Sequence, residues 1–206
     1  MASEEVLKVR QKRLIGVRIG VVLTGSHCTI GAALPQIEKL KEEGAEITPI
    51  ISYTVDETDN RFYKVDDLKA FLNQLSDNPV INTIVEAEPI GPQKLLDVIV
   101  VMPATGNTIA KLASGIVDTP ALMAIKAHLR NQRPVVIAIS TNDALGINAR
   151  NLGLLLNMKN IYFVPFRQDD PHQKANSLLA NLEQVVDTTV FALQGRQIQP
   201  LLLGSL

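Results

Sequence analysis

Small polar residues follow the apolar runs of this 206-residue chain, at positions where a plain loop would more often carry Lys, Glu or Pro. The first such segment is TGSHCT, residues 24–29, directly after the apolar run that ends at Leu23. Gly25 allows close backbone approach, while Ser26 and Thr29 can donate hydrogen bonds at a helix start whose amides already favour an anion. The segment is therefore typical of a phosphate-binding loop.

Four later segments repeat the pattern, with hydroxyl, amide or glycine groups after an apolar run: 52–54 (SYT), 103–108 (PATGNT), 140–143 (STND) and 165–172 (PFRQDDPH). The carboxyl ends of parallel strands meet on one side of an open sheet, and ligands bind in the crevice outside them. Each segment alone could also serve as a turn or a helix cap. Five together predict one ligand cleft, although composition does not name the ligand.

Two common nucleotide-binding motifs are missing from the sequence. The chain has no Walker loop ending in G-K-S or G-K-T, and its first loop lacks the G-x-G-x-x-G spacing of a dinucleotide fingerprint. An ATPase or a plain NAD domain is therefore not supported.

The elements that position these segments alternate between β-rich apolar runs and helix-period stretches, which indicates βαβ units and a parallel sheet. Residues 52–64 are polar and long enough for a working loop. Residues 195–206 form either a strand or tail on the domain edge or a subunit contact. We predict strands at 15–23, 46–51, 97–102, 134–139 and 160–164. The first predicted helix runs from the first loop to a cap at Gly44, and further helices are predicted at 65–75, 107–114, 119–130, 148–158 and 176–193.

Composition narrows the class of protein. Hydrophobic residues make up 46% of the chain, which suits one domain over residues 1–206, and Lys plus Arg (20) nearly cancel Asp plus Glu (21). This balance disfavours a nucleic-acid role. The single Cys28 excludes an internal disulfide, the N-terminus lacks the apolar core of a signal peptide, and no apolar run is long enough to cross a bilayer. We therefore expect a soluble cytoplasmic protein without a membrane partner.

The motifs TGSHCT and DVIVVMPATGNTIAKLASGIVDTP resemble the flavoprotein family of flavin-dependent cysteine decarboxylases and flavin prenyltransferases. Within this family, ISTNDALG and QDDP resemble the group of dipicolinate synthase B subunits, and the resemblance covers nearly the whole chain. It implies an α/β three-layer sandwich with a central parallel sheet in flavodoxin-like or Rossmann-like strand order. It also implies a homo-oligomer, a trimer or a multiple of trimers, with FMN between subunits.

The resemblance also implies site residues. It assigns the FMN phosphate to Gly25, Ser26 and Ser52. The family motif of the type P-A-S-A-N-T corresponds to residues 103–108, where Asn107 would contact a substrate carboxylate as the catalytic residue. The remaining predicted cofactor contacts come from this motif and from the segment after the fourth predicted strand: Thr105, Thr108, Ser140 and Asn142.

Two departures from the decarboxylases argue against cysteine decarboxylation: the histidine that the family carries shortly before the third strand is missing from VEAEPIGPQKLLDVIVV, and STNDALG, residues 140–146, replaces the family's substrate clamp. The resemblance instead implies oxidation of dihydrodipicolinate to dipicolinate, pyridine-2,6-dicarboxylate, in the mother cell during spore formation. The partner would be an A subunit with its own nicotinamide-binding domain, which could use NADP. Two alternatives stay open: a flavin-less partner that binds the intermediate or activates the A subunit, and a flavin-dependent decarboxylase.

A dicarboxylate needs cationic or amide partners, so Arg150, Arg167 and Lys111, near the strand-exit segments, are candidate substrate-binding residues. Each could instead pair with an acidic neighbour. His27 is either an acid or base or points away from the ligand, and Cys28 either packs as a small apolar group or has a redox role. Two further interpretations concern acidic segments: Asn142 and Asp143 orient a ligand or cap a helix, and Asp169, Asp170 and His172 form a solvated turn instead of a metal site.

Overall fold

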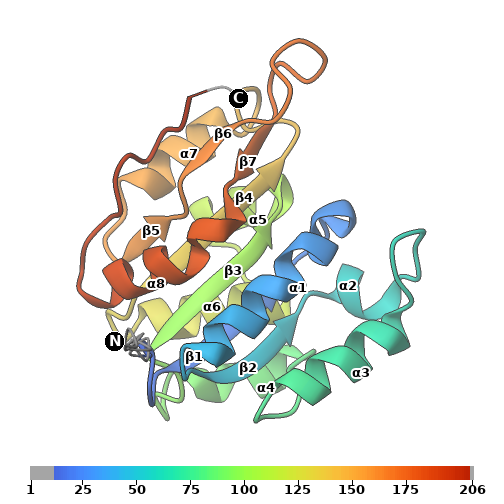
Figure 1. The fold of residues 1–206 in the computed structure, drawn as a ribbon, viewed down its shortest axis with the longest axis vertical. Helices are drawn as coiled ribbons and strands as arrows, with labels where there is room; N and C mark the ends of the chain where they lie inside the picture. Colours follow the sequence, from blue (N-terminus) through green and yellow to red (C-terminus); the bar gives the residue numbers. More distant parts are fainter. Residues whose placement is uncertain (1–11, 205–206) are drawn as a thin grey trace, which may run out of the picture.

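The computed structural model describes residues 12–204, and its seven strands form one mixed sheet with helices on both faces (Figure 1). The expectation of no signal peptide concerns residues that lie largely outside this range. Five strands run parallel in the order β2-β1-β3-β4-β5, while β7 and β6 add an antiparallel extension. The strands are β1 (Arg18–Leu23), β2 (Glu46–Ile51), β3 (Val98–Ala104), β4 (Val135–Thr141), β5 (Ile161–Phe163), β6 (Phe166–Gln168) and β7 (Leu178–Ala180).

Helices on the two faces complete the predicted three-layer α/β fold. One face carries α1 and α8, and the other carries α5 and α6, with α7 beside α5 and α4 beside α6 (Figure 1). The helices are α1 (His27–Glu42), α2 (Tyr53–Glu57), α3 (Val65–Leu75), α4 (Ile84–Ala87), α5 (Gly106–Ala113), α6 (Pro120–Leu129), α7 (Ala149–Leu156) and α8 (Val185–Leu193), with 3-10 turns η1 (Glu88–Ile90) and η2 (Leu182–Gln184).

Apolar patterning explains the central layer. Every residue of β3 is buried, as expected of a parallel strand that is covered on both faces. α1 buries Ile30, Ala33, Ile37 and Leu40, which follow the spacing of a helix with one apolar face. It ends before Gly44, whose φ of +95° confirms the predicted glycine cap.

The two central strands extend further than the sequence indicated. β3 continues to Ala104 and β4 to Thr141, so Ser140 and Thr141 are strand residues instead of loop residues. The cause is a change of partner along β4: its first half pairs with β5, whereas Ser140 and Thr141 pair antiparallel with β7. One strand therefore supports both the parallel sheet and the β6–β7 hairpin.

The prediction of a helix over residues 176–193 is wrong in its first half. Residues 178–180 form β7, in which Leu178 and Ala180 are buried and Leu179 is partly exposed, as the two-residue period of a strand requires. Hydrogen-bonding partners on both β4 and β6 hold this segment extended, and the α-helix begins at Val185. β6 and α4 were not predicted.

The remaining expectations concern two surface segments. Residues 52–64 contain the short helix α2 followed by a loop. The C-terminal segment runs beside β6, because Phe166 N–H donates to Leu201 O at 3.0 Å and Leu203 N–H donates to Phe166 O at 2.9 Å. This confirms the tail-on-the-edge interpretation for the described residues. None of the helices in residues 12–204 is long and apolar enough to cross a membrane.

His128 on α6 is a fully buried imidazole with an incomplete set of hydrogen-bonding partners. Its Nε2 lies 3.1 Å from the carbonyl oxygen of Pro134, and its Nδ1 has no partner. Burial lowers the pKa of His128 from 6.5 to about 4, because the charged imidazolium is poorly solvated there.

We expect His128 to make the fold acid-sensitive between pH 6.5 and pH 4. The unfolded chain takes up this proton near pH 6.5 while the folded chain does not, so the free energy of unfolding falls by ~3 kcal/mol as the pH drops through this window. In urea titrations at pH 7 and pH 4, His128→Gln should lose less stability than the unaltered protein by about this amount. Equal losses in the two proteins would contradict the assignment.

Candidate functional site

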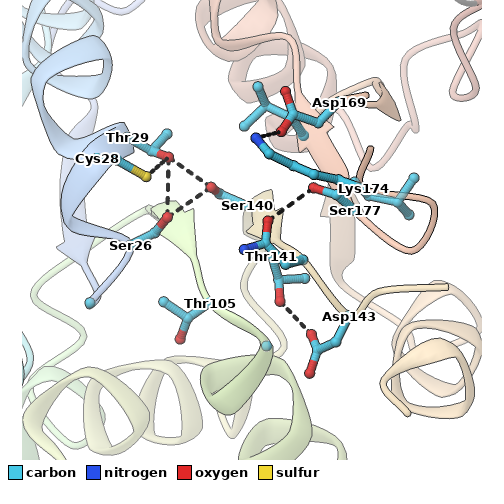
Figure 2. A pocket seen from close by; sticks show the side chains of 15 residues that line it. Ser26, Cys28, Thr29, Thr105, Ser140, Thr141, Asp143, Asp169, Lys174 and Ser177 are labelled. Atoms are coloured by element: carbon cyan, nitrogen blue, oxygen red, sulfur yellow. Dashed lines mark hydrogen bonds and ion pairs between the residues drawn. The ribbon is translucent and has the colours of Figure 1, made fainter. Parts of the chain in front are cut away.

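Two adjoining cavities lie at the carboxyl ends of the parallel strands. The larger, of about 650 Å³, is lined by the loop after β1, the ends of β3 and β4, and the β6–β7 hairpin (Figure 2). The smaller, of about 260 Å³, lies between the loop after β1, Ser52 after β2, and the first residues of α5 and α6. Gly25 and Thr105 line both cavities. The strand exits that the sequence singled out thus meet in one region.

Three hydroxyl groups form a triangle in the wall of the larger cavity. Ser26 Oγ lies 3.1 Å from Thr29 Oγ1 and 2.9 Å from Ser140 Oγ, and Thr29 Oγ1 lies 2.8 Å from Ser140 Oγ (Figure 2). Ser26 and Thr29 come from the start of α1, whereas Ser140 comes from the end of β4. The structure therefore brings Ser26 and Ser140 together although 114 residues separate them.

A polar network fixes Asp143 in the same wall. The Thr141 hydroxyl donates to Asp143 Oδ1, and Asn148 Nδ2 donates to Asp143 Oδ2 at 2.8 Å. Asn148 is itself buried and accepts a hydrogen bond from Asn151 Nδ2 at 2.8 Å. A Cβ on Gly106 would come within 2.6 Å of Asp143 Oδ1, so glycine is what allows the start of α5 to pack against this carboxylate.

The β6–β7 hairpin contributes charges that the sequence reasoning missed. Lys174 and Asp169 both line the larger cavity, and Lys174 Nζ lies 2.7 Å from Asp169 Oδ2. This hydrogen bond raises the pKa of Lys174. Ser177 Oγ donates to Asn142 Oδ1 at 3.3 Å and so connects the hairpin to the end of β4. Among the described residues that line this cavity, Lys174 is the one cationic side chain.

The smaller cavity is rich in hydroxyl groups. Thr24 Oγ1 donates to Pro103 O at 2.7 Å and accepts from Thr105 N–H at 3.1 Å, which joins the ends of β1 and β3. Thr105 caps α5 by accepting from Thr108 N–H at 3.2 Å. Asn107 supplies an amide. None of the described residues lining this cavity carries a charge.

Ser52 provides the clearest sign of a ligand in the smaller cavity. Its Oγ is buried without any hydrogen-bonding partner, and the residue is 8% exposed. An unpaired buried hydroxyl is unfavourable unless a ligand oxygen completes its hydrogen bonding. The absence of a side chain at Gly25 leaves the backbone open to close approach, and a Cβ at this position would lie only 3.2 Å from Thr54 Cγ2. Hydroxyl and amide groups can donate hydrogen bonds to a phosphate, so the residues present fit the phosphate group of FMN.

The three predicted cations are not among the residues that line these cavities. Arg150 is exposed on α7, and Lys111 pairs with Asp118. Arg167, on β6, lines a separate shallow cavity of about 310 Å³. All three were predicted from their proximity in sequence to a strand exit.

For Cys28 and His27 in the first loop, the structure disagrees with one of the two interpretations given for each residue. Cys28 is exposed and lines the larger cavity, so the prediction that it packs as a small apolar group is wrong. His27 lines neither cavity: its Nδ1 lies 2.7 Å from the Tyr63 hydroxyl and 3.2 Å from the Asn60 amide. This arrangement supports the interpretation that His27 points away from the ligand.

The acidic hairpin turn shows no metal site. Asp170 Oδ1 accepts hydrogen bonds from the backbone N–H groups of His172 and Gln173, at 3.1 and 3.0 Å, which is the geometry of a turn. Within residues 12–204, no group of three or more His, Cys, Asp or Glu side chains could hold a metal ion. Asp143 does not cap α7 through its side chain, whose contacts are with Thr141 and Asn148.

A flavodoxin-like sheet with hydroxyl-lined cavities at the carboxyl ends of its strands defines an α/β ligand-binding protein of the flavoprotein class. The chain belongs to the Flavoprotein family, whose model matches residues 8–193. It is 48% identical over 190 residues to the B subunit of dipicolinate synthase from Bacillus subtilis (strain 168), covering 92% of this chain and 95% of that protein.

Solved structures agree with this placement. The crystal structure of the dipicolinate synthase B subunit from Bacillus halodurans C is 46% identical, with a TM-score of 0.86 over 94% of this chain and 99% of that one. The cypemycin decarboxylase CypD is 22% identical, with a TM-score of 0.63 over 87% of this chain and 94% of that one. The second likeness shows a shared fold.

Substitution of Gly106 by Ala should destabilise the protein by ~1–3 kcal/mol, because the new methyl group would overlap three polar atoms 2.6–2.8 Å away. Gly153 on α7 is a matched control, since a Cβ there meets nothing within 4 Å. Gly153→Ala should leave stability unchanged or raise it by up to ~1 kcal/mol through helix propensity. Urea unfolding measures both, and a neutral Gly106→Ala would mean that this contact is loose.

Proposed function

We propose that the chain is the flavin-binding B subunit of a dipicolinate synthase, which works with an A subunit to oxidise dihydrodipicolinate to dipicolinate. The observation that carries the proposal is the 48% identity over 92% of the chain to a protein of that name. The name itself implies an A subunit, to which we assign the nicotinamide cofactor, NADP. We place the reaction in the cytoplasm of the mother cell during spore formation.

FMN is the cofactor that we assign to this chain. In support, the Ser52 hydroxyl is buried and unpartnered, and Gly25 allows close approach beside it. Ser52, Gly25 and Ser26 would hold the phosphate. Bound FMN would supply an acceptor for two electrons. The other cofactor contacts that we propose line one or both cavities: Thr105, Thr108, Ser140 and Asn142.

The substrate carries two carboxylates, so its binding requires a cation or amide donors. We retain Asn107 as the residue that contacts a carboxylate, because its amide donates without adding charge. The second carboxylate is assigned to Lys174, in place of Arg150, Arg167 and Lys111. Lys174 lines the larger cavity and forms an ion pair there with Asp169. A ligand carboxylate would replace Asp169 as its partner.

Assembly with further chains is part of the proposal. Leu145 and Ile147, in the loop after β4, are 46% and 78% exposed, and Leu154 on α7 is 57% exposed. Large apolar side chains that are exposed to this extent favour contact with another chain. We propose a homo-oligomer, a trimer or a multiple of trimers, that is joined by the A subunit.

Ser52→Ala should have opposite effects on the free protein and on its complex with FMN. Removing an unpaired buried hydroxyl should stabilise the free protein by ~1 kcal/mol. Losing a hydrogen bond to a charged phosphate should weaken FMN binding by about 10- to 100-fold. Flavin fluorescence titration measures the affinity, and thermal unfolding the stability.

Riboflavin is the matched control ligand for Ser52→Ala, because it has the same ring and no phosphate. Its binding should be unchanged by the substitution. If Ser52→Ala weakened riboflavin and FMN equally, Ser52 would contact the ring or its chain instead of the phosphate.

Reconstitution with the A subunit tests the function itself. The purified chain should take up FMN and turn yellow, and dipicolinate should form only when both subunits are present. Lys174→Met should raise KM for the substrate about tenfold, because one charge-assisted contact is lost. Lys159→Met, at an exposed position, should have no effect. A colourless chain that binds no FMN, with full turnover by the A subunit alone, would assign a non-catalytic role instead.

A further inference from the structure

Asp143 is a carboxylate that the structure holds fixed in the wall of the larger cavity (Figure 2). Thr141 and Asn148 each donate to one of its oxygens, and Asn148 is 5% exposed and supported by Asn151, which is 6% exposed. A side chain restrained from behind by buried partners keeps its position when a ligand binds. Asp143 is thus held in one orientation, and the proposed binding of cofactor and substrate assigns it no role.

Both oxygens of the Asp143 carboxylate also have free hydrogen-bond acceptor sites. Each carboxylate oxygen has about two acceptor sites, and one donor occupies each oxygen of Asp143. No ion pair involves Asp143 among the described residues, whereas Asp169, the other acidic residue of the cavity, is paired with Lys174. Besides these two acids, the titratable side chains lining the cavity are Cys28 and Lys174. Asp143 is therefore the acid of this wall that no cation neutralises.

The proposed oxidation needs a group of this kind. Converting a 2,3-dihydropyridine to a pyridine breaks one C–H bond at each of the two adjacent saturated ring carbons. One hydrogen leaves with its electron pair to a two-electron acceptor, a flavin or a nicotinamide. The other leaves as a proton, and its electron pair stays in the ring as the new double bond. The acceptor is reduced, the ring is oxidised, and the proton requires a base.

We propose that the Asp143 carboxylate is the base that takes this ring proton, with Thr141 and Asn148 as the residues that position it. The inference rests on the proposed function, because it assumes that the dihydropyridine dicarboxylate spans the two adjoining cavities, with one carboxylate at Asn107 in the smaller and the other at Lys174 in the larger. The proton is released when the product leaves.

The first test is turnover by the reconstituted pair. Asp143→Asn keeps the shape of the side chain but accepts no proton, so kcat should fall about 100- to 1000-fold, the usual contribution of a general base. Asp67→Asn, at an exposed position on α3, is the matched control and should leave kcat unchanged. Circular dichroism and FMN affinity verify that Asp143→Asn is folded.

The second test needs no turnover. Calorimetric titration of the isolated chain with dipicolinate at pH 7 measures its affinity for the product. Asp143→Asn should bind dipicolinate about tenfold more tightly than the unaltered protein, because the substitution removes a negative charge that faces the dianion. Asp67→Asn should bind dipicolinate as the unaltered protein does.

The outcomes separate this inference from the proposed function. If the unaltered pair forms dipicolinate and Asp143→Asn does so within about threefold of its rate, Asp143 is not the base and the proposed function stands. Equal affinity of Asp143→Asn and the unaltered protein for dipicolinate, or no binding of dipicolinate to this chain, also overturns the role of Asp143 while leaving a two-subunit synthase intact. If the unaltered pair forms no dipicolinate, the proposed function fails and the role of Asp143 falls with it.

Discussion

Parallel pairing between buried strands is the constraint on which the rest of this structure depends. The register places Leu23 beside Ile51, Val22 beside Val101, and Ala104 beside Ile139, so β1 to β4 end near one another. A strand shifted along its axis would draw the polar residues that follow it into the buried layer and expose apolar side chains at its other end. Burial therefore fixes the register, and the register brings polar residues distant in sequence into one region.

The same constraint explains what the sequence could and could not predict. Ser26, Ser52 and Ser140 line the two cavities as the sequence predicted, because a polar residue after a buried strand must lie at the carboxyl end of the sheet. Lys174 was not predicted there, because it belongs to a hairpin of two three-residue strands, too short for a period to show, and β7 resembled the start of a helix. Arg150 is exposed on α7 and lines neither cavity, because sequence position gives a residue's element but not the direction of its side chain.

Charge is distributed unevenly between the two cavities. The smaller cavity offers hydroxyl and amide groups without a charged side chain among its described lining residues, and the larger one has its charges on Asp143 and on the hairpin pair Asp169 and Lys174. A neutral wall binds an anion through oriented donors, with little desolvation of side-chain charge. Ionic groups at the other cavity can exchange partners when a ligand arrives. The fold thus places uncharged donors in one cavity and ionic groups in the other.

The edges of the sheet at β2, β5 and β6 all have partners within the chain, and at β5 the Gln197 side chain accepts from Phe163 N–H at 2.8 Å and donates to Phe163 O at 2.7 Å. Residue 81 pairs with Ile50 on the outer side of β2, and Leu202 pairs with Phe166 on the outer side of β6. Exposed strand edges are templates for adding strands from other molecules, which leads to aggregation. With these partners in place, the edges offer few free backbone groups to a strand from another molecule.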